Sequence, residues 1–205
     1  MKHLPRLAAI VAALLFTAAV AGFGAALEGY SHSMHPVGLL GARGVPHAVA
    51  FNALGFVLPG ALAAFVGLRL RTAIGDGGPW IARIGAWLAL LSALAFAAQG
   101  LLPLDPGDLE ADASRAHATA WTLWWVAFVP AAAMLAAGLR QARTSRVLVA
   151  ASVIAAIVVA VLAMLPLQPL APAVTQRMVF ATWLAWWVLA AWSVATAAVA
   201  TARSG

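Results

Sequence analysis

Long apolar runs alternate along the chain with short connections that hold most of its charged residues. A helix that crosses a bilayer needs about 20 mostly apolar residues, and six runs reach that length. The pattern therefore predicts an all-α, polytopic membrane protein in which residues 1–205 form a single transmembrane domain with six transmembrane helices. We expect these helices at residues 5–27, 45–68, 80–102, 117–139, 147–167 and 178–202.

The composition supports lipid as the solvent of this chain. Hydrophobic residues make up 64% of the sequence and charged residues only 9%, whereas a soluble domain has about 25% charged residues. The chain has no cysteine, which excludes disulfides and thiolate chemistry. The net charge of +6 does not indicate nucleic acid as a partner, because the basic residues are scattered singly between apolar runs.

The basic residues predict the orientation of the spans. Nine of the twelve Lys and Arg residues belong to connections and ends on one side of the predicted helices, and three lie on the other. Short cytoplasmic loops carry the excess of Lys and Arg, so we expect a bacterial cytoplasmic (inner) membrane protein with both termini in the cytoplasm. The three basic residues on the outer side are Arg43, Arg115 and Arg177.

Short motifs suggest that the chain contains an internal repeat. LPLDP at 102–106 recurs as LPLQP at 165–169, and WTLWW at 121–125 recurs as WLAWW at 183–187. HAVAF at 47–51 also parallels HATAW at 117–121. These matches favour three parallel helical hairpins, although chance matches between Ala- and Trp-rich segments are the alternative. We interpret the repeated tryptophans as an interfacial belt or a packing face.

A set of polar residues near the outer ends of the spans forms the candidate binding site. Polar groups in membranes are costly and often functional, and we expect Asp105 to pair with Arg115 or with His117. Such a rim would bind a ligand or would supply an acid/base pair. The alternative is that these side chains only fasten the outer connections to the helix ends. The candidate residues are His47, Asn52, Asp105, Arg115 and His117.

The first outer connection contains a weaker candidate for a metal site. Glu28, His32 and His35 would share one face if the first helix continued outward, and these residue types bind divalent metals. However, Pro36 disfavours helical geometry at His35. A solvated loop is therefore the alternative interpretation, and the sequence identifies no cofactor.

Several of these features resemble a known family. They are a polar first outer connection, the Phe51-Asn52-x-x-Gly55-Phe56 step, and Pro103-x-Asp105 followed by His117. With them, the chain resembles the DUF998 family of bacterial multi-pass membrane proteins over most of its length. Because the function of that family is unknown, the resemblance implies six helices and a bacterial membrane but assigns no residue a role.

Three classes of function stay open at this point. The first is a membrane module that binds a small molecule, a lipid head group or a partner protein at its extracytoplasmic face. The second is a membrane-embedded enzyme, metal-dependent or acid/base, that acts on a lipid-soluble substrate. The third is a transporter of a neutral substrate, because Pro59-Gly60 and Pro130 would interrupt helices while no charge lies at a span centre. The sequence does not predict the oligomeric state.

Overall fold

The computed structural model describes residues 3–141, 145–165 and 170–201, with side chains up to Ser193. Within these residues the fold is all-helical, and helices occupy each of the six predicted segments. In chain order the elements are α1 (Leu4–Ala26), η1 (Val37–Gly41), α2 (Ala48–Phe51), η2 (Asn52–Val57), α3 (Leu58–Ile74), α4 (Trp80–Leu101), α5 (Asp112–Gln141), α6 (Arg146–Met164) and α7 (Pro172–Thr201).

Most of the long helices have the length and composition of membrane spans. Five stretches qualify among the described residues, and α2, η2 and α3 together form one of them. The chain is therefore a multi-pass membrane protein. The five stretches are Leu4–Ala26, Ala48–Ile74, Trp80–Leu101, Asp112–Gln141 and Arg146–Met164.

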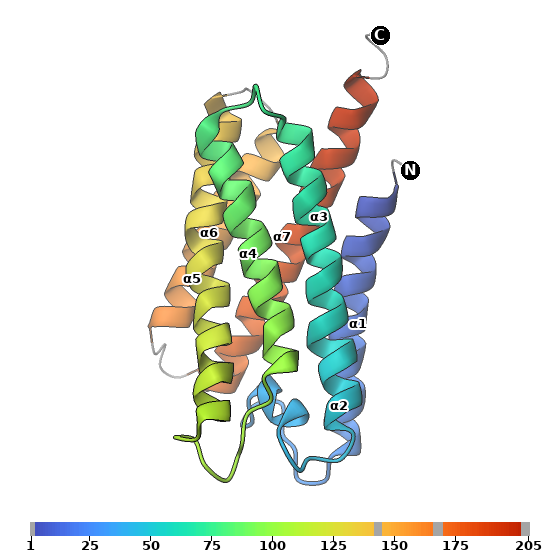
Figure 1. Ribbon diagram of the computed structural model, residues 1–205, viewed down its shortest axis with the longest axis vertical. Helices are drawn as coiled ribbons and strands as arrows, with labels where there is room; N and C mark the ends of the chain where they lie inside the picture. The colour runs from blue at the N-terminus through green and yellow to red at the C-terminus, as the bar shows by residue number, and fades with distance from the viewer. Residues whose placement is uncertain (1–2, 142–144, 166–169, 202–205) are drawn as a thin grey trace.

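The helices run up and down, so that their connections collect at two ends (Figure 1). One end, here called the loop end, holds the connections 27–47 and 102–111 and the beginning of α7. The other end holds the beginning of α1, the end of α7 and the short connection between α3 and α4. The helix α7 packs against α1, α3 and α6, which brings the first and the last long helix together.

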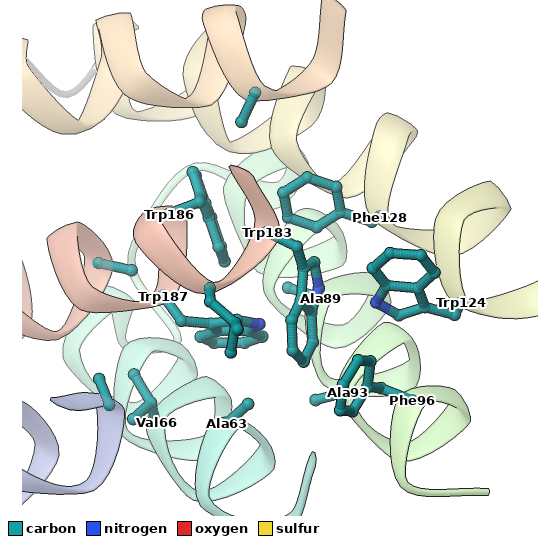
Figure 2. Packing of buried hydrophobic residues seen from close by; sticks show 14 of the residues in the cluster. Ala63, Val66, Ala89, Ala93, Phe96, Trp124, Phe128, Trp183, Trp186 and Trp187 are labelled. Carbon is teal, nitrogen blue, oxygen red and sulfur yellow. The ribbon is translucent and has the colours of Figure 1, made fainter. Parts of the chain in front are cut away.

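Aromatic side chains fill the centre of the bundle (Figure 2). Trp183 of α7 stacks on Phe96 of α4 with ring centroids 4.5 Å apart, and Trp124 of α5 meets Trp183 edge-on. Two tryptophan N–H groups find serine partners, since Trp183 donates to Ser92 Oγ at 3.2 Å and Trp186 donates to Ser152 Oγ at 2.9 Å. The repeated tryptophans are thus mainly a packing face, because Trp124, Trp183, Trp186 and Trp187 are fully buried.

Glycines let neighbouring helices approach closely at several points. A Cβ at Gly60 of α3 would lie 2.7 Å from the backbone nitrogen of Ala97 in α4. A Cβ at Gly138 of α5 would lie 2.6 Å from the backbone nitrogen of Ala82 in α4. Small residues at such contacts are typical of helix packing in membranes, where dispersion contacts replace the hydrophobic effect as the source of stability.

Several helix ends differ from the predicted boundaries. The second long helix runs from Ala48 to Ile74 rather than over 45–68, because Arg71 favours the last turn and Gly75, with φ of 69°, ends it. At that end Arg71 donates to the Asp76 carboxylate at 2.6 Å and holds the pKa of this carboxyl below its ordinary value. The helix α5 begins at Asp112 rather than at 117, since an acidic residue favours a first turn.

The structure also contains a wide helical turn that apolar periodicity did not indicate. Residues Asn52–Val57 form a π-helix in which the N–H of Leu58 donates to Ala53 O. The wide turns directly precede Pro59, which has no N–H to donate to the turn before it. Such π segments occur frequently at functional sites, and here the segment begins at one of the predicted site residues.

Candidate functional site

The first connection at the loop end folds back onto the helices. Its 3-10 helix η1 buries Val37, Gly38, Leu40 and Gly41 and contacts α1, α2 and α7. The connection is also joined to the next one, because the N–H of Arg43 donates to Leu104 O at 2.9 Å. The stretch that the sequence suggested to be a solvated loop is therefore partly an element of the packed bundle.

Asn52 anchors η1 from the π-helix. Its Nδ2 donates to Gly41 O at 2.9 Å, and the side chain is buried. Gly41 has to be small because the three heavy atoms nearest to an added Cβ all belong to the Asn52 side chain. Asn52 thus satisfies a carbonyl of η1 that would otherwise lack a partner in an apolar setting.

His117 fastens the beginning of α5 to the end of α4. Its Nδ1 lies 3.2 Å from Gln99 O and 2.9 Å from Leu102 O. Because both partners are carbonyls that only accept, Nδ1 must carry the proton. The Nε2 side of the ring faces η1, where a Cβ at Gly38 would lie 2.9 Å away. His117 is therefore held against carbonyls at the end of α4, which agrees with the alternative that these side chains fasten the outer connections to the helix ends.

The expected pairs of Asp105 do not form. Its carboxylate accepts from the N–H of Gly107 at 3.0 Å within its own turn. Arg115 instead pairs with Glu110 at 3.1 Å, and both side chains are exposed. His47 is exposed at the start of α2 with φ of 61°, so the parallel between HAVAF and HATAW does not give the two histidines equivalent positions. The structure brings Asn52 and His117 to η1 and leaves Asp105 and Arg115 apart from them. The exposed His47 lines a shallow hollow to which Gly41 and Asn52 also contribute.

A polar cluster that the sequence did not single out lies where α7 meets the first connection. Arg177 is half-buried there, and its guanidinium donates only to neutral groups. The sequence contained one indication of this cluster. No acidic residue follows Asp112, so Arg177 could not form an ion pair with a carboxylate close to it in the sequence. The acceptors are Ala173 O at 2.8 Å, His35 O at 3.1 Å, Tyr30 Oη at 2.6 Å and His32 Nδ1 at 3.5 Å.

The hydrogen bonds around Arg177 use neutral acceptor atoms. Tyr30 Oη donates to Pro36 O at 3.3 Å, and burial raises the pKa of this phenol while Arg177 partly offsets the rise. His35 Nδ1 accepts from the N–H of Ser31 at 2.9 Å, and His32 Nδ1 accepts from Arg177. These bonds place the ring proton on Nε2 in each neutral histidine. The cluster therefore holds one positive charge and, among the described residues, no carboxylate that pairs with it.

The predicted metal ligands are distributed differently. Glu28 is exposed, whereas His32 and His35 lie on the Tyr30 ring and contribute to the Arg177 cluster. In the part of the chain that the structure describes, no three His, Asp or Glu side chains are placed to hold a metal ion. The geometry therefore gives no support to the ligand set that the spacing suggested.

A groove opens beside the Arg177 cluster, between α5, α6 and α7. Its volume is about 580 Å³. The walls are mainly apolar, and Thr175 and Gln176 supply polar groups. The Oε1 of Gln176 accepts from the N–H of Val37 at 2.9 Å, which leaves its amide nitrogen with two donors to offer. Apolar lining residues include Trp121, Leu162, Met164, Leu170 and Val179.

The comparison with protein families agrees with the resemblance found in the sequence. Residues 10–193 match the family described as "Protein of unknown function (DUF998)". The chain belongs to the DUF998 family. This DUF998 protein matches no curated protein and no solved structure, so the role of its groove and its polar cluster has to be argued from the geometry alone.

Proposed function

We propose that this DUF998 protein spans the bacterial inner membrane six times, with both termini in the cytoplasm and the loop end outside. The sorting of the basic residues supports this orientation. The sixth span would be α7, which has 30 residues and supplies three of the four fully buried tryptophans, Trp183, Trp186 and Trp187. In this proposal three hairpin repeats, α1 with α3, α4 with α5, and α6 with α7, each turn at the loop end.

Single cysteines test this topology directly, because the chain has none of its own. Gly107 lies in the connection between α4 and α5, and Gly77 lies in the connection between α3 and α4. A membrane-impermeant maleimide should label Gly107→Cys on intact cells and should label Gly77→Cys only after lysis. The reverse result would place the loop end in the cytoplasm and would contradict the orientation.

For the function, we infer that the groove between α5, α6 and α7 binds one end of a lipid-like amphiphile. The observation that supports this is the joint presence, in one groove, of apolar walls and of the amide donors of Gln176. An amphiphile satisfies both, since its chain contacts the walls while its head group meets Gln176. The groove is lined by the end of α6 and the beginning of α7, and the ends of membrane helices are where head groups and chains of lipids meet. The enzyme and transporter hypotheses stay predictions.

Counting bound lipids tests this function. Ala163 lines the groove from α6 and is half-buried, so Ala163→Trp should fill the space. Ile157 on the same helix is 59% exposed and does not line the groove, which makes Ile157→Trp a matched control. Native mass spectrometry of protein purified in mild detergent should show a retained lipid in the wild type and in the control, and its loss in Ala163→Trp. Equal lipid retention in all three proteins would refute the proposal.

A further inference from the structure

The Arg177 cluster lies directly at the edge of the proposed lipid groove. The guanidinium donates to Ala173 O, and Ala173 lines the groove. It also donates to Tyr30, whose hydroxyl is bonded to the groove-lining Pro36. Gln176, the polar residue of the groove, directly precedes Arg177 in α7. A fixed positive charge therefore stands behind the groove wall beside Ala173 and Gln176, although Arg177 itself does not line the groove.

The charge of Arg177 has no carboxylate partner and is only partly screened by water, and in both respects it differs from Arg115 at the same end of the bundle. Arg115 pairs with Glu110 and its side chain is 63% exposed, so water screens it. Arg177 is half-buried, all of its acceptors are neutral, and its Nε is buried without a hydrogen-bond partner. Glu28, the acidic residue nearest to the cluster in the sequence, is exposed and forms no ion pair among the described residues. A half-buried charge of this kind favours an anionic partner.

We propose that the groove selects an amphiphile with an anionic, phosphate-bearing head group, and that Arg177 determines this selectivity. The inference rests on the lipid function proposed above and names the chemical class of its ligand. The apolar walls favour a lipid over a free phosphate ion, because an ion would leave them unoccupied. The amide of Gln176 can donate to a phosphate oxygen. The terminal N–H groups of Arg177 are engaged by neutral acceptors, so its charge attracts the head group through space rather than through a direct hydrogen bond.

The test compares two lipids that differ in net charge. Protein in detergent is incubated with equal amounts of phosphatidylglycerol and phosphatidylcholine, and native mass spectrometry measures the ratio retained at the site that Ala163→Trp blocks. The wild type should prefer phosphatidylglycerol about tenfold, which corresponds to a charge attraction of about 1.4 kcal/mol near a half-buried arginine. Arg177→Gln should lower this preference to about twofold or less while a lipid is still bound. Raised salt should weaken the wild-type preference as well.

Controls separate the possible outcomes. Arg115→Gln removes an exposed arginine of the loop end that pairs with Glu110, and it should leave the preference unchanged. Inorganic phosphate alone should not displace the lipid, and efficient displacement would assign the site to a soluble anion. Equal retention of both lipids by the wild type, a preference unaffected by salt, or an unchanged preference in Arg177→Gln would overturn the anionic selectivity while the lipid groove stands. If the wild type retained no lipid at all, that result would instead refute the proposed function itself.

Discussion

The contact between Gly41 and Asn52 gives the sharpest prediction about stability. Asn52→Ala removes a buried hydrogen bond and leaves Gly41 O without a partner, which should cost about 1–3 kcal/mol. Gly41→Ala should cost about 1–3 kcal/mol as well, because its new Cβ would overlap the Asn52 amide. Backbone strain does not contribute, since Gly41 is not among the glycines with positive φ.

The double variant decides whether the two effects share one cause. Once Asn52 is alanine, the methyl group at residue 41 enters space that the amide has vacated, so the double variant should be about as stable as Asn52→Ala alone. Thermal unfolding in detergent, followed by tryptophan fluorescence, measures this, with about 2–4 °C per kcal/mol for a chain of this size. Additivity of the two single effects within about 0.5 kcal/mol would show that the residues do not touch and would refute the reasoning.

Three further predictions concern other contacts. His117→Ala should destabilise the fold by about 1–3 kcal/mol, whereas His117→Asn should recover much of this loss in the same unfolding assay, because the amide nitrogen of Asn replaces Nδ1 as the donor. Tyr30 is the single tyrosine, so tyrosinate absorbance reports it alone; its ionisation should have a midpoint above about 10, and Arg177→Gln should raise that midpoint further because a pKa-lowering charge is lost. A midpoint at or below that of free tyrosine would contradict the burial of this phenol. Gly60→Ala should lower the melting temperature because its Cβ meets the backbone of α4, whereas Gly22→Ala, which meets nothing within 4 Å, should not lower it.

The sequence predicted the long helices well because their signal is local. Each apolar run is long enough to cross a bilayer, and the polar segments between the runs set the approximate boundaries. The boundary errors at Asp112 and Ile74 arise because helical hydrogen bonding continues beyond the apolar residues. The π-helix was missed for a different reason, since its hydrogen-bond pattern leaves no periodic mark over six residues.

The candidate site was predicted less well because its contacts join distant parts of the chain. The bond between Val37 and Gln176 spans 139 positions, and the bond between Tyr30 and Arg177 spans 147. Sequence proximity instead suggested that Asp105 pairs with Arg115, but a closer carboxylate, Glu110, takes that arginine. Asn52 was identified correctly as a notable polar residue, since an amide inside an apolar run needs a partner wherever it lies. Its partner in η1 could not be inferred from spacing.

The π-helix has a consequence for how the length of the chain can change in evolution. Each residue of an α-helix advances the chain by about 100° around the axis. A π turn holds about one residue more than an α turn, so deleting one residue between Asn52 and Val57 would allow the turn to close as an ordinary α-helix while the residues before it keep their orientation relative to α3. Asn52 would still face Gly41 after that deletion, whereas the loss of one residue within the regular turns of α3 would rotate everything before it by about 100° relative to the rest of α3 and would detach η1 from the bundle.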